Sequence, residues 1–277
     1  MAGIAFALIA SVCWGTADFL GGLYSRRLPV VLVLFAVQAG GLVVIAVVLA
    51  AAASPAPDAR AAVAALAAGA AGVAALAAFY RALAIGTMSI VAPVSATGVA
   101  LPVVVGVATG ESLRTPVAIG LVVTVLGVIL ASSESAGGGA PSGGLRSVGL
   151  ALLAAVGFGT FFVAYDVAAD GSVPWAMFLS RIIGVVPLGV LALGRARRAA
   201  PRDLAALAGV GVIDASAIGL YALANTHAAL AVVSVVGSLY PVATVVLARL
   251  VLRERIRPVQ AAGVAAALTG VALIASG

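Results

Sequence analysis

Gly127-Val128-Ile129-Leu130-Ala131-Ser132 closes the first half of this chain, and Gly270-Val271-Ala272-Leu273-Ile274-Ala275-Ser276 closes the second half. Toward the N-terminus, Trp14-Gly15-Thr16 stands near the start of the first half, and Phe158-Gly159-Thr160 stands near the start of the second. The offset between matching positions is 143 residues at the closing stretches and 144 at the opening ones. Self-similarity at a nearly fixed offset indicates an internal duplication.

The composition of the chain indicates whether the protein lies in water or in a membrane. The 277 residues are 64% hydrophobic and only 9% charged, and the mean hydropathy is +1.27. A soluble domain carries about 25% charged residues. A soluble core cannot hide this much apolar surface, so the sequence predicts an all-α integral membrane protein. Two copies of one hydropathy pattern are typical of a transporter assembled from internal repeats.

Ten apolar segments approach the length of about 20 residues that a membrane-spanning helix needs. Pro55 and Pro57 interrupt the chain after the second segment, because proline lacks a donor and clashes with the preceding turn. Pro116 and Pro258 each stand at a segment start, where the missing donor costs nothing. The expected segments are 3–23, 30–53, 61–84, 89–108, 116–133, 148–169, 173–193, 204–226, 229–251 and 258–276.

These segments fall into two repeats. The first repeat is expected over residues 1–133 and the second over residues 148–277, with a Gly- and Ser-rich linker at 134–147 between them. Each repeat holds five segments. Because five is an odd number, the second copy enters the membrane from the opposite side, and the two copies form an inverted repeat.

The distribution of arginine checks this inversion independently, since all fifteen basic residues are arginines. The connection after the first segment holds Arg26 and Arg27, whereas the equivalent connection after the sixth holds none. The connection after the second segment holds Arg60 alone, whereas its equivalent holds four arginines within 195–202. Connections on one side of the membrane carry ten arginines and those on the other carry two. The positive-inside rule therefore predicts that both termini lie outside.

Charged groups inside a membrane are costly and usually face a cavity or a partner. Asp18 lies deep in the first segment, one turn after Trp14, so both side chains share one helical face. A carboxyl group beside an aromatic ring suits proton transfer or a cationic substrate, which makes Asp18 the candidate for proton coupling. A structural hydrogen bond to a neighbouring helix is the alternative.

A second pair of charges lies in the other half. Arg181 is well inside the seventh segment and Asp214 is near the middle of the eighth. An isolated arginine there is unfavourable, so we expect Asp214 to be its counter-charge. The pair suits a structural role and a clamp for a substrate carboxylate equally. Gln38 is the equivalent of Arg181 in the first copy, at an offset of 143.

Aromatic and amide side chains complete the expected site. Tyr80 and Arg81 lie near the end of the third segment, and Tyr221 takes a similar place in the second copy, close to Asn225. Such groups suit an amphipathic solute. The expected substrate-binding residues are Trp14, Asp18, Gln38, Tyr80, Arg81, Arg181, Asp214, Tyr221, Asn225 and Tyr240.

Three prolines are expected to break the backbone hydrogen-bond ladder inside membrane spans. Pro93 and Pro102 lie in the fourth segment, and Pro241 lies in the ninth. The carbonyls that they free can line a transport pathway. The alternative is that these prolines only kink the helices.

Signatures of several other functions are missing from the sequence. One histidine and one cysteine cannot form a zinc site, and no nucleophile elbow G-x-S-x-G is present. A chain without lysine has no P-loop, which excludes ATP-driven transport by this chain. The arginines form no run with interleaved aromatics, which argues against nucleic-acid binding. We expect no catalytic residue, no metal and no cofactor.

The order of five motifs resembles the EamA-type transporters of the drug/metabolite transporter superfamily, and the resemblance covers both halves. The motifs are Trp14-Gly15-Thr16-Ala17-Asp18-Phe19, Tyr80-Arg81-Ala82-Leu83-Ala84, Val91-Ala92-Pro93-Val94-Ser95, Gly110-Glu111, and Tyr240-Pro241 followed by Arg253-Glu254. The resemblance implies ten helices in two inverted five-helix repeats around a central cavity. It also implies transport of metabolites, often amino acids or related solutes, and frequently outward.

Two departures from the family pattern bear on orientation and on the site. Ten-helix relatives usually keep both termini in the cytoplasm, whereas the arginines here predict the reverse. Arg253 also replaces the usual glycine before Glu254. We therefore expect Glu254 to cap the end of a loop rather than to line the cavity.

Together these features predict a secondary transporter or facilitator in the plasma membrane. It would move a small amino acid-like or drug-like solute, outward, by alternating access, with the lipid bilayer and protons as its other partners. The alternative is a polytopic membrane scaffold or an intramembrane enzyme that transports nothing. A solvent-filled centre favours transport, and a dry, tightly packed centre favours a scaffold.

Overall fold

The computed structural model describes residues 2–110, 114–131, 144–195, 199–227, 233, 236–237 and 239–276. Every regular element in this part of the chain is helical. The first half contains α1 (Ala2–Ser25), α2 (Val30–Ala52), α3 (Ala59–Ile85), α4 (Met88–Ala96), the 3₁₀ helix η1 (Thr97–Val99), α5 (Ala100–Ala108) and α6 (Thr115–Ala131). The second half contains α7 (Gly144–Ala169), α8 (Val173–Leu193), α9 (Pro201–His227), α11 (Tyr240–Val251) and α12 (Pro258–Ala275).

Within the described residues, seven helical stretches are long and apolar enough to cross a membrane, counting Met88–Gly106 as one, and three further apolar helices are shorter. The prediction of an all-helical membrane protein is thereby confirmed. The predicted segment 229–251 is represented mainly by α11, because most of 228–238 lies outside the described residues. The predicted linker 134–147 is described only from Gly144, where α7 already begins.

Glycine contacts reveal the duplication in the packing itself. Gly15 of α1 lies against the backbone of Tyr240, and Gly159 of α7 lies in the same way against the backbone of Gly98. The partners are 142 residues apart, as the duplication requires. A glycine permits such close approach because it has no Cβ that would strike the neighbouring backbone. The first helix of each half thus packs on the fourth segment of the other half.

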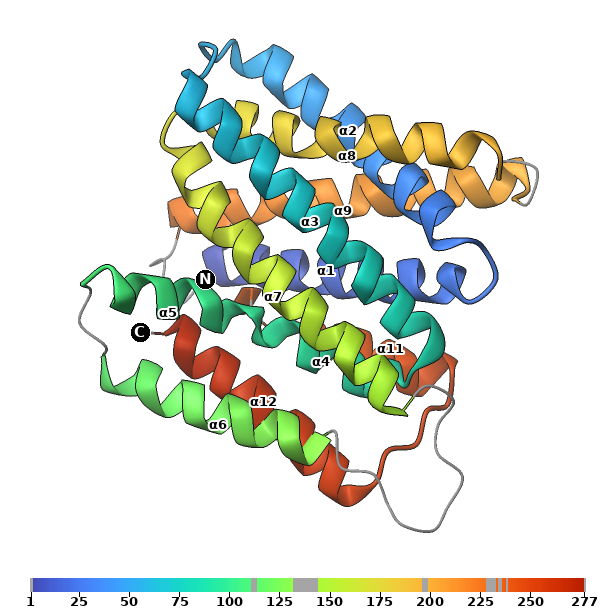
Figure 1. Ribbon diagram of the computed structural model, residues 1–277, viewed down its shortest axis with the longest axis vertical. Coiled ribbons are helices and arrows are strands. Elements are labelled where there is room, and N and C mark those ends of the chain that lie inside the picture. The colour runs from blue at the N-terminus through green and yellow to red at the C-terminus, as the bar shows by residue number, and fades with distance from the viewer. Residues whose placement is uncertain are drawn as a thin grey trace.

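The first helices of the two halves, α1 and α7, run in opposite directions. Gly86, at the end of α3, lies against Ser147 at the start of α7, whereas Gly171, just after α7, lies against Ala61 at the start of α3. Hence α3 and α7 are antiparallel. The C-terminal ends of α1 and α3 lie together, since Gly22 packs on Leu83. It follows that α1 and its equivalent α7 are antiparallel (Figure 1).

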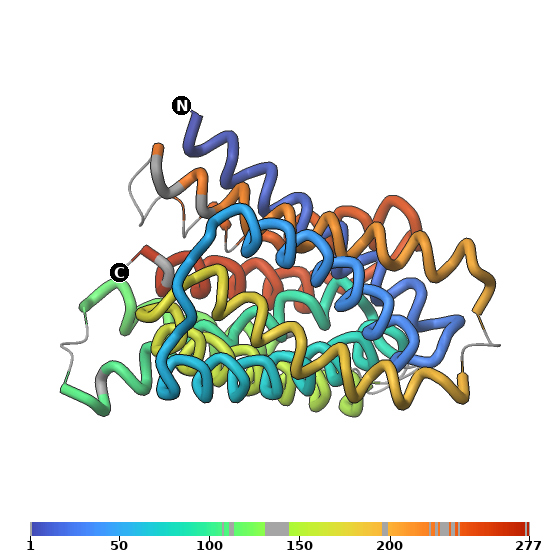
Figure 2. Tube along the Cα trace, turned by 90° about the horizontal axis from the view of Figure 1, so that it is seen from above, coloured from blue at the N-terminus to red at the C-terminus, as the bar shows by residue number. Residues whose placement is uncertain are grey.

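The helices form an elongated bundle with α2 and α8 at one end of its long axis and α6 and α12 at the other (Figure 1). The N- and C-termini lie toward the same side in both views (Figures 1 and 2). Large apolar side chains such as Val43, Val190 and Leu250 are exposed on the outside. Lipid tails are a suitable environment for this surface.

Candidate functional site

The guanidinium of Arg181 joins three helices at one polar site. Its Nη1 donates to Oε1 of Gln38 in α2 over 2.8 Å, and its Nη2 forms an ion pair with Oδ2 of Asp214 in α9. The side chains of Arg181 and Asp214 are 11% and 27% exposed. The predicted pairing of Arg181 with Asp214 is confirmed. The bond to Gln38 satisfies a further donor of the same guanidinium.

Glycines make the space that this guanidinium occupies. A Cβ on Gly41 would lie 2.7 Å from Nη1 of Arg181, so any other residue there would push the side chain away. Gly184 is the equivalent position at an offset of 143, and a Cβ there would lie 3.4 Å from Nε2 of Gln38. Gly211, one turn before Asp214, packs against the backbone of Val37. These contacts bring α2, α8 and α9 close enough for the three polar side chains to meet.

Asp18 belongs to the same electrostatic neighbourhood but has no bonded partner among the described residues. It lies half-buried in α1 and within electrostatic range of Asp214, Tyr80 and Tyr240. In the described part of the chain, its carboxyl group makes no hydrogen bond and no ion pair. The ring of Tyr80 ends against Gly21, one turn after Asp18. The arrangement sets an unpaired carboxyl group next to a satisfied ion pair.

Two aromatic rings pack together one turn before Asp18 along α1. Trp14 and Tyr221 have ring centroids 5.5 Å apart and an interplanar angle of 46°. Both rings are half-buried. The hydroxyl of Thr244 donates to the carbonyl oxygen of Gly15 over 3.0 Å, which ties α1 to α11 near Tyr240. The side chain of Asn225 lies outside the described residues, so its predicted place in this site stays a prediction.

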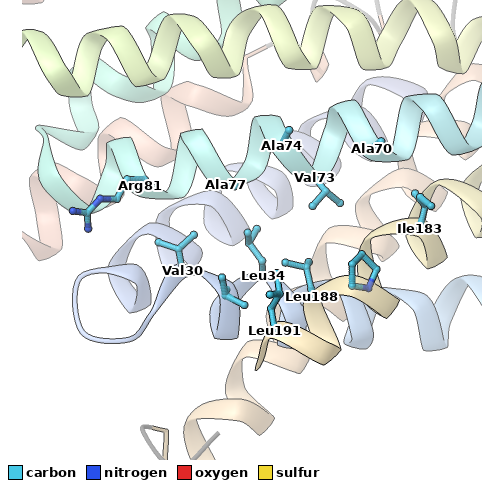
Figure 3. Close-up of a pocket in the computed structure, with 12 residues that line it drawn as sticks. Val30, Leu34, Ala70, Val73, Ala74, Ala77, Arg81, Ile183, Leu188 and Leu191 are labelled. Carbon is cyan, nitrogen blue, oxygen red and sulfur yellow. The ribbon is translucent and has the colours of Figure 1, made fainter. Parts of the chain in front are cut away.

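Arg81 is set apart from these residues. Its side chain is exposed and lines a lateral groove with Val30 and Leu34 from α2 (Figure 3). Tyr80, its neighbour in sequence, is only 2% exposed. Consecutive helix residues point about 100° apart, so the two side chains face different surroundings.

The three prolines occupy different kinds of position. Pro93 lies inside α4, and four residues later the helix changes to 3₁₀ geometry over Thr97–Val99. Pro102 is the third residue of α5, and Pro241 is the second residue of α11. Proline fits the first turn of a helix without loss of a bond. The stretch before Pro241 lies largely outside the described residues, so a break of the ninth span there stays a prediction.

The polar cluster around Glu254 lies outside the site predicted from the sequence. Glu254 accepts hydrogen bonds from the backbone amides of Met88 and Ser89 at 3.0 and 2.9 Å, and from the Ser89 hydroxyl at 2.9 Å. It also pairs with Arg26 at 3.3 Å. The expectation that Glu254 acts as a cap is confirmed, but the helix that it caps is α4, far away in sequence. Arg253 before it adopts φ 54°, the left-handed region that favours glycine.

The described residues contain no group of three or more His, Cys, Asp or Glu side chains that could hold a metal ion. The polar atoms of the central site are instead one guanidinium, two carboxyl groups, one amide and several phenols. This set can bind a polar organic molecule or exchange a proton.

Comparisons with known proteins agree with this architecture. No curated protein sequence matches the chain. A solved structure described only as the crystal structure of a protein is 15% identical, covers 96% of this chain and 97% of its own, and superposes with a TM-score of 0.60. At that identity the likeness shows the fold alone. The sequence profile of the EamA-like transporter family matches residues 1–133 and 145–276. The chain therefore belongs to the EamA-like transporter family, and it is a multi-pass integral membrane protein of a family that transports small solutes.

Proposed function

We propose that this protein is a secondary transporter that exports a small organic solute by alternating access, with ten membrane-spanning helices in two inverted repeats. The proposed site consists of Trp14, Asp18, Gln38, Tyr80, Arg181, Asp214, Tyr221, Asn225 and Tyr240. Asp18 is its proton-coupling residue. ATP takes no part, and neither does nucleic acid. The antiparallel course of α1 and α7 supports the inverted arrangement.

The observation that carries this proposal is the contrast between the two charged groups. Arg181 is held on one side by Gln38 and on the other by Asp214, so its charge is compensated. Asp18 has no such partner among the described residues, although an unpaired carboxyl group inside a membrane is costly. A proton or a cationic group of the solute would relieve this cost. Because a proton and the solute exchange for each other at Asp18, the movement of one across the membrane is coupled to the movement of the other.

The position of Gln38 and Arg181 supports alternating access. They are equivalent residues of the two copies, and they contact each other directly. A contact between equivalent positions lies on the pseudo-twofold axis that relates the copies. Inverted repeats can exchange their conformations by rocking about such a fixed site.

The cluster around Glu254 supports a state that is closed at one end. Arg26 donates to the carbonyl oxygens of Leu83 and Gly86 and pairs with Glu254, which ties the ends of α1 and α3 to the turn after α11. In the sequence, the equivalents of Arg26 and Glu254 are Asp170 and Glu111. Two acids repel rather than attract. The ion pair of the Glu254 cluster therefore cannot form at the opposite end of the protein, and we infer that the resting state is open at that end.

Transport in proteoliposomes tests the proposal. A thermal-shift screen of amino acids, sugars and organic cations on purified protein first selects a solute. Uptake of that solute is then measured with and without a pH gradient. We expect gradient-driven uptake by the natural sequence and by Asp166→Asn, a control at an exposed carboxyl group of α7. Asp18→Asn should lose the response to the gradient. Normal, gradient-driven uptake by Asp18→Asn would refute the coupling role, and absence of any solute flux would favour a scaffold.

A further inference from the structure

A lateral groove of about 560 Å³ lies between α2, α3 and α8, away from the central polar site. Eleven of its twelve lining residues are apolar, and the remaining one is Arg81. Arg81 stands at one end of the groove, and Ala70 and Ile183 lie toward the other end (Figure 3). Ile183 and Leu191, on its wall, are 36% and 52% exposed. The groove is therefore open to whatever surrounds the protein.

The groove exists because one stripe of α3 is made of small residues. Ala70, Ala74 and Ala77 line it together with Arg81. Their spacing of three or four residues places all four on one face of the helix. Methyl side chains do not reach across to Leu34 of α2 or to α8, and so a channel remains. The same stripe ends in a cation.

Arg81 has no anionic partner among the described residues. In the described part of the chain its guanidinium makes no hydrogen bond and no ion pair. An arginine at the edge of an apolar wall in a membrane requires water or an anion.

The length and the position of the groove match one leaflet of a bilayer. Arg81 lies one turn before the end of α3, on the side of the protein whose connections carry ten of the arginines. Ala70 lies eleven positions earlier, which is about 16 Å along a helix. Half of a hydrocarbon core of about 30 Å is about 15 Å. The groove thus begins where headgroups lie and ends near the middle of the membrane.

We propose that this groove is a binding site for an anionic phospholipid. The phosphate lies on Arg81, and one acyl chain lies along Val30, Leu34, Val73 and Leu188. Basic sites between membrane helices on the arginine-rich side are suited to such headgroups. Because α2 and α3 belong to the first copy and α8 to the second, the bound lipid bridges the two repeats. It can therefore stabilise their packing.

The duplication supports a specific role for this arginine. With the offsets of 142 to 144 residues found between the copies, the positions equivalent to Arg81 fall at Leu223 to Asn225, where the second copy has no basic residue. The fold alone therefore does not require a cation at this place. The repeat is broken here in the same way as at Gln38 and Arg181, where the two copies differ in charge.

Lipid titration of the purified, delipidated full chain tests the site. The midpoint of thermal unfolding is followed with added phosphatidylglycerol, phosphatidylcholine or glycerol 1-phosphate, and native mass spectrometry counts the bound lipids. We expect tight binding of phosphatidylglycerol, weaker binding of phosphatidylcholine and no effect of glycerol 1-phosphate. Arg81→Gln should weaken phosphatidylglycerol about fivefold, the factor expected for one basic contact. Arg81→Lys should retain most of the affinity, which guards against a mere folding defect.

Matched variants separate the groove from the general surface. Ala74→Phe should fill the groove and abolish the preference, whereas Ala67→Phe, exposed on the same helix outside the lining, should not. Arg249→Gln removes an exposed arginine in the last turn of α11 and should bind like the natural sequence. Equal losses in Arg81→Gln and Arg249→Gln would overturn the proposal. So would saturation by glycerol 1-phosphate, which indicates a free-anion site, or full binding by Ala74→Phe.

Discussion

Gln38 and Arg181 occupy the same position in the two copies of the repeat, 143 residues apart, and the Arg181 guanidinium donates directly to the Gln38 side-chain oxygen. Residues on a pseudo-twofold axis meet their own equivalents. Two arginines would repel at this point, and two glutamines would leave Asp214 without a cation. The copies had to diverge here for the contact to hold a charge. The asymmetry is therefore part of how the centre is built.

The first prediction concerns the counter-charge. Asp214→Asn leaves the guanidinium of Arg181 uncompensated in a site where it is only 11% exposed. Removing one partner of a buried pair costs about 3 kcal/mol. We expect a clear loss in the thermal unfolding midpoint of purified protein. The double variant Arg181→Gln with Asp214→Asn should recover most of the loss, because it leaves no unpaired charge. Equal losses in the single and double variants would contradict this account.

The second prediction uses two glycines of one helix. A Cβ at Gly211 would strike the carbonyl oxygen of Val37, whereas a Cβ at Gly209 would meet nothing within 4 Å. Gly211→Ala should therefore destabilise the protein by about 1–3 kcal/mol through overpacking. Gly209→Ala should be neutral or stabilising by about 0.5–1 kcal/mol, since alanine suits a helix interior better. Thermal unfolding of both variants under the same conditions tests this difference in stability. Similar midpoints would argue against close packing of α2 on α9.

Features that depend on the residues of a single helix could be predicted from the sequence. Each of the ten apolar segments contains described helical residues, and the ion pair between Arg181 and Asp214 followed from the cost of an isolated charge in lipid. The duplication was visible as a constant offset. The direct contact of Gln38 with Arg181 was not predicted, because it depends on how the two copies pack and not on either copy alone.

The separation of Arg81 from Tyr80 could have been anticipated from helical geometry. Adjacent residues on a helix face different directions, so their nearness in sequence argued against one shared site. The bonds of Glu254 to α4 lay beyond the sequence for another reason. They join positions 165 and 166 residues apart, and no local spacing encodes that meeting.

The third prediction tests the cap on α4. Glu254→Ala removes the acceptors of two backbone amides and leaves Arg26 without its carboxylate. A lost cap costs about 1–2 kcal/mol, and we expect a loss of that size in thermal unfolding. Glu254→Gln should lose less, because its amide oxygen still accepts one bond. Arg27→Gln, at an exposed neighbour of Arg26, serves as the control. A midpoint for Glu254→Ala equal to that of the control would speak against the cap.

The last prediction concerns the orientation of the protein in the membrane. Single cysteines at Arg27→Cys and Arg60→Cys, in a Cys13→Ser background, place a thiol on each side, since both positions are exposed. The arginine count predicts that position 27 faces the cytoplasm. A membrane-impermeant maleimide on intact cells should then label position 60 and spare position 27. Labelling of position 27 alone would put both termini in the cytoplasm, as in most ten-helix relatives. The groove at Arg81 would then lie in the outer leaflet, and the cluster around Glu254 would lie on the outer side.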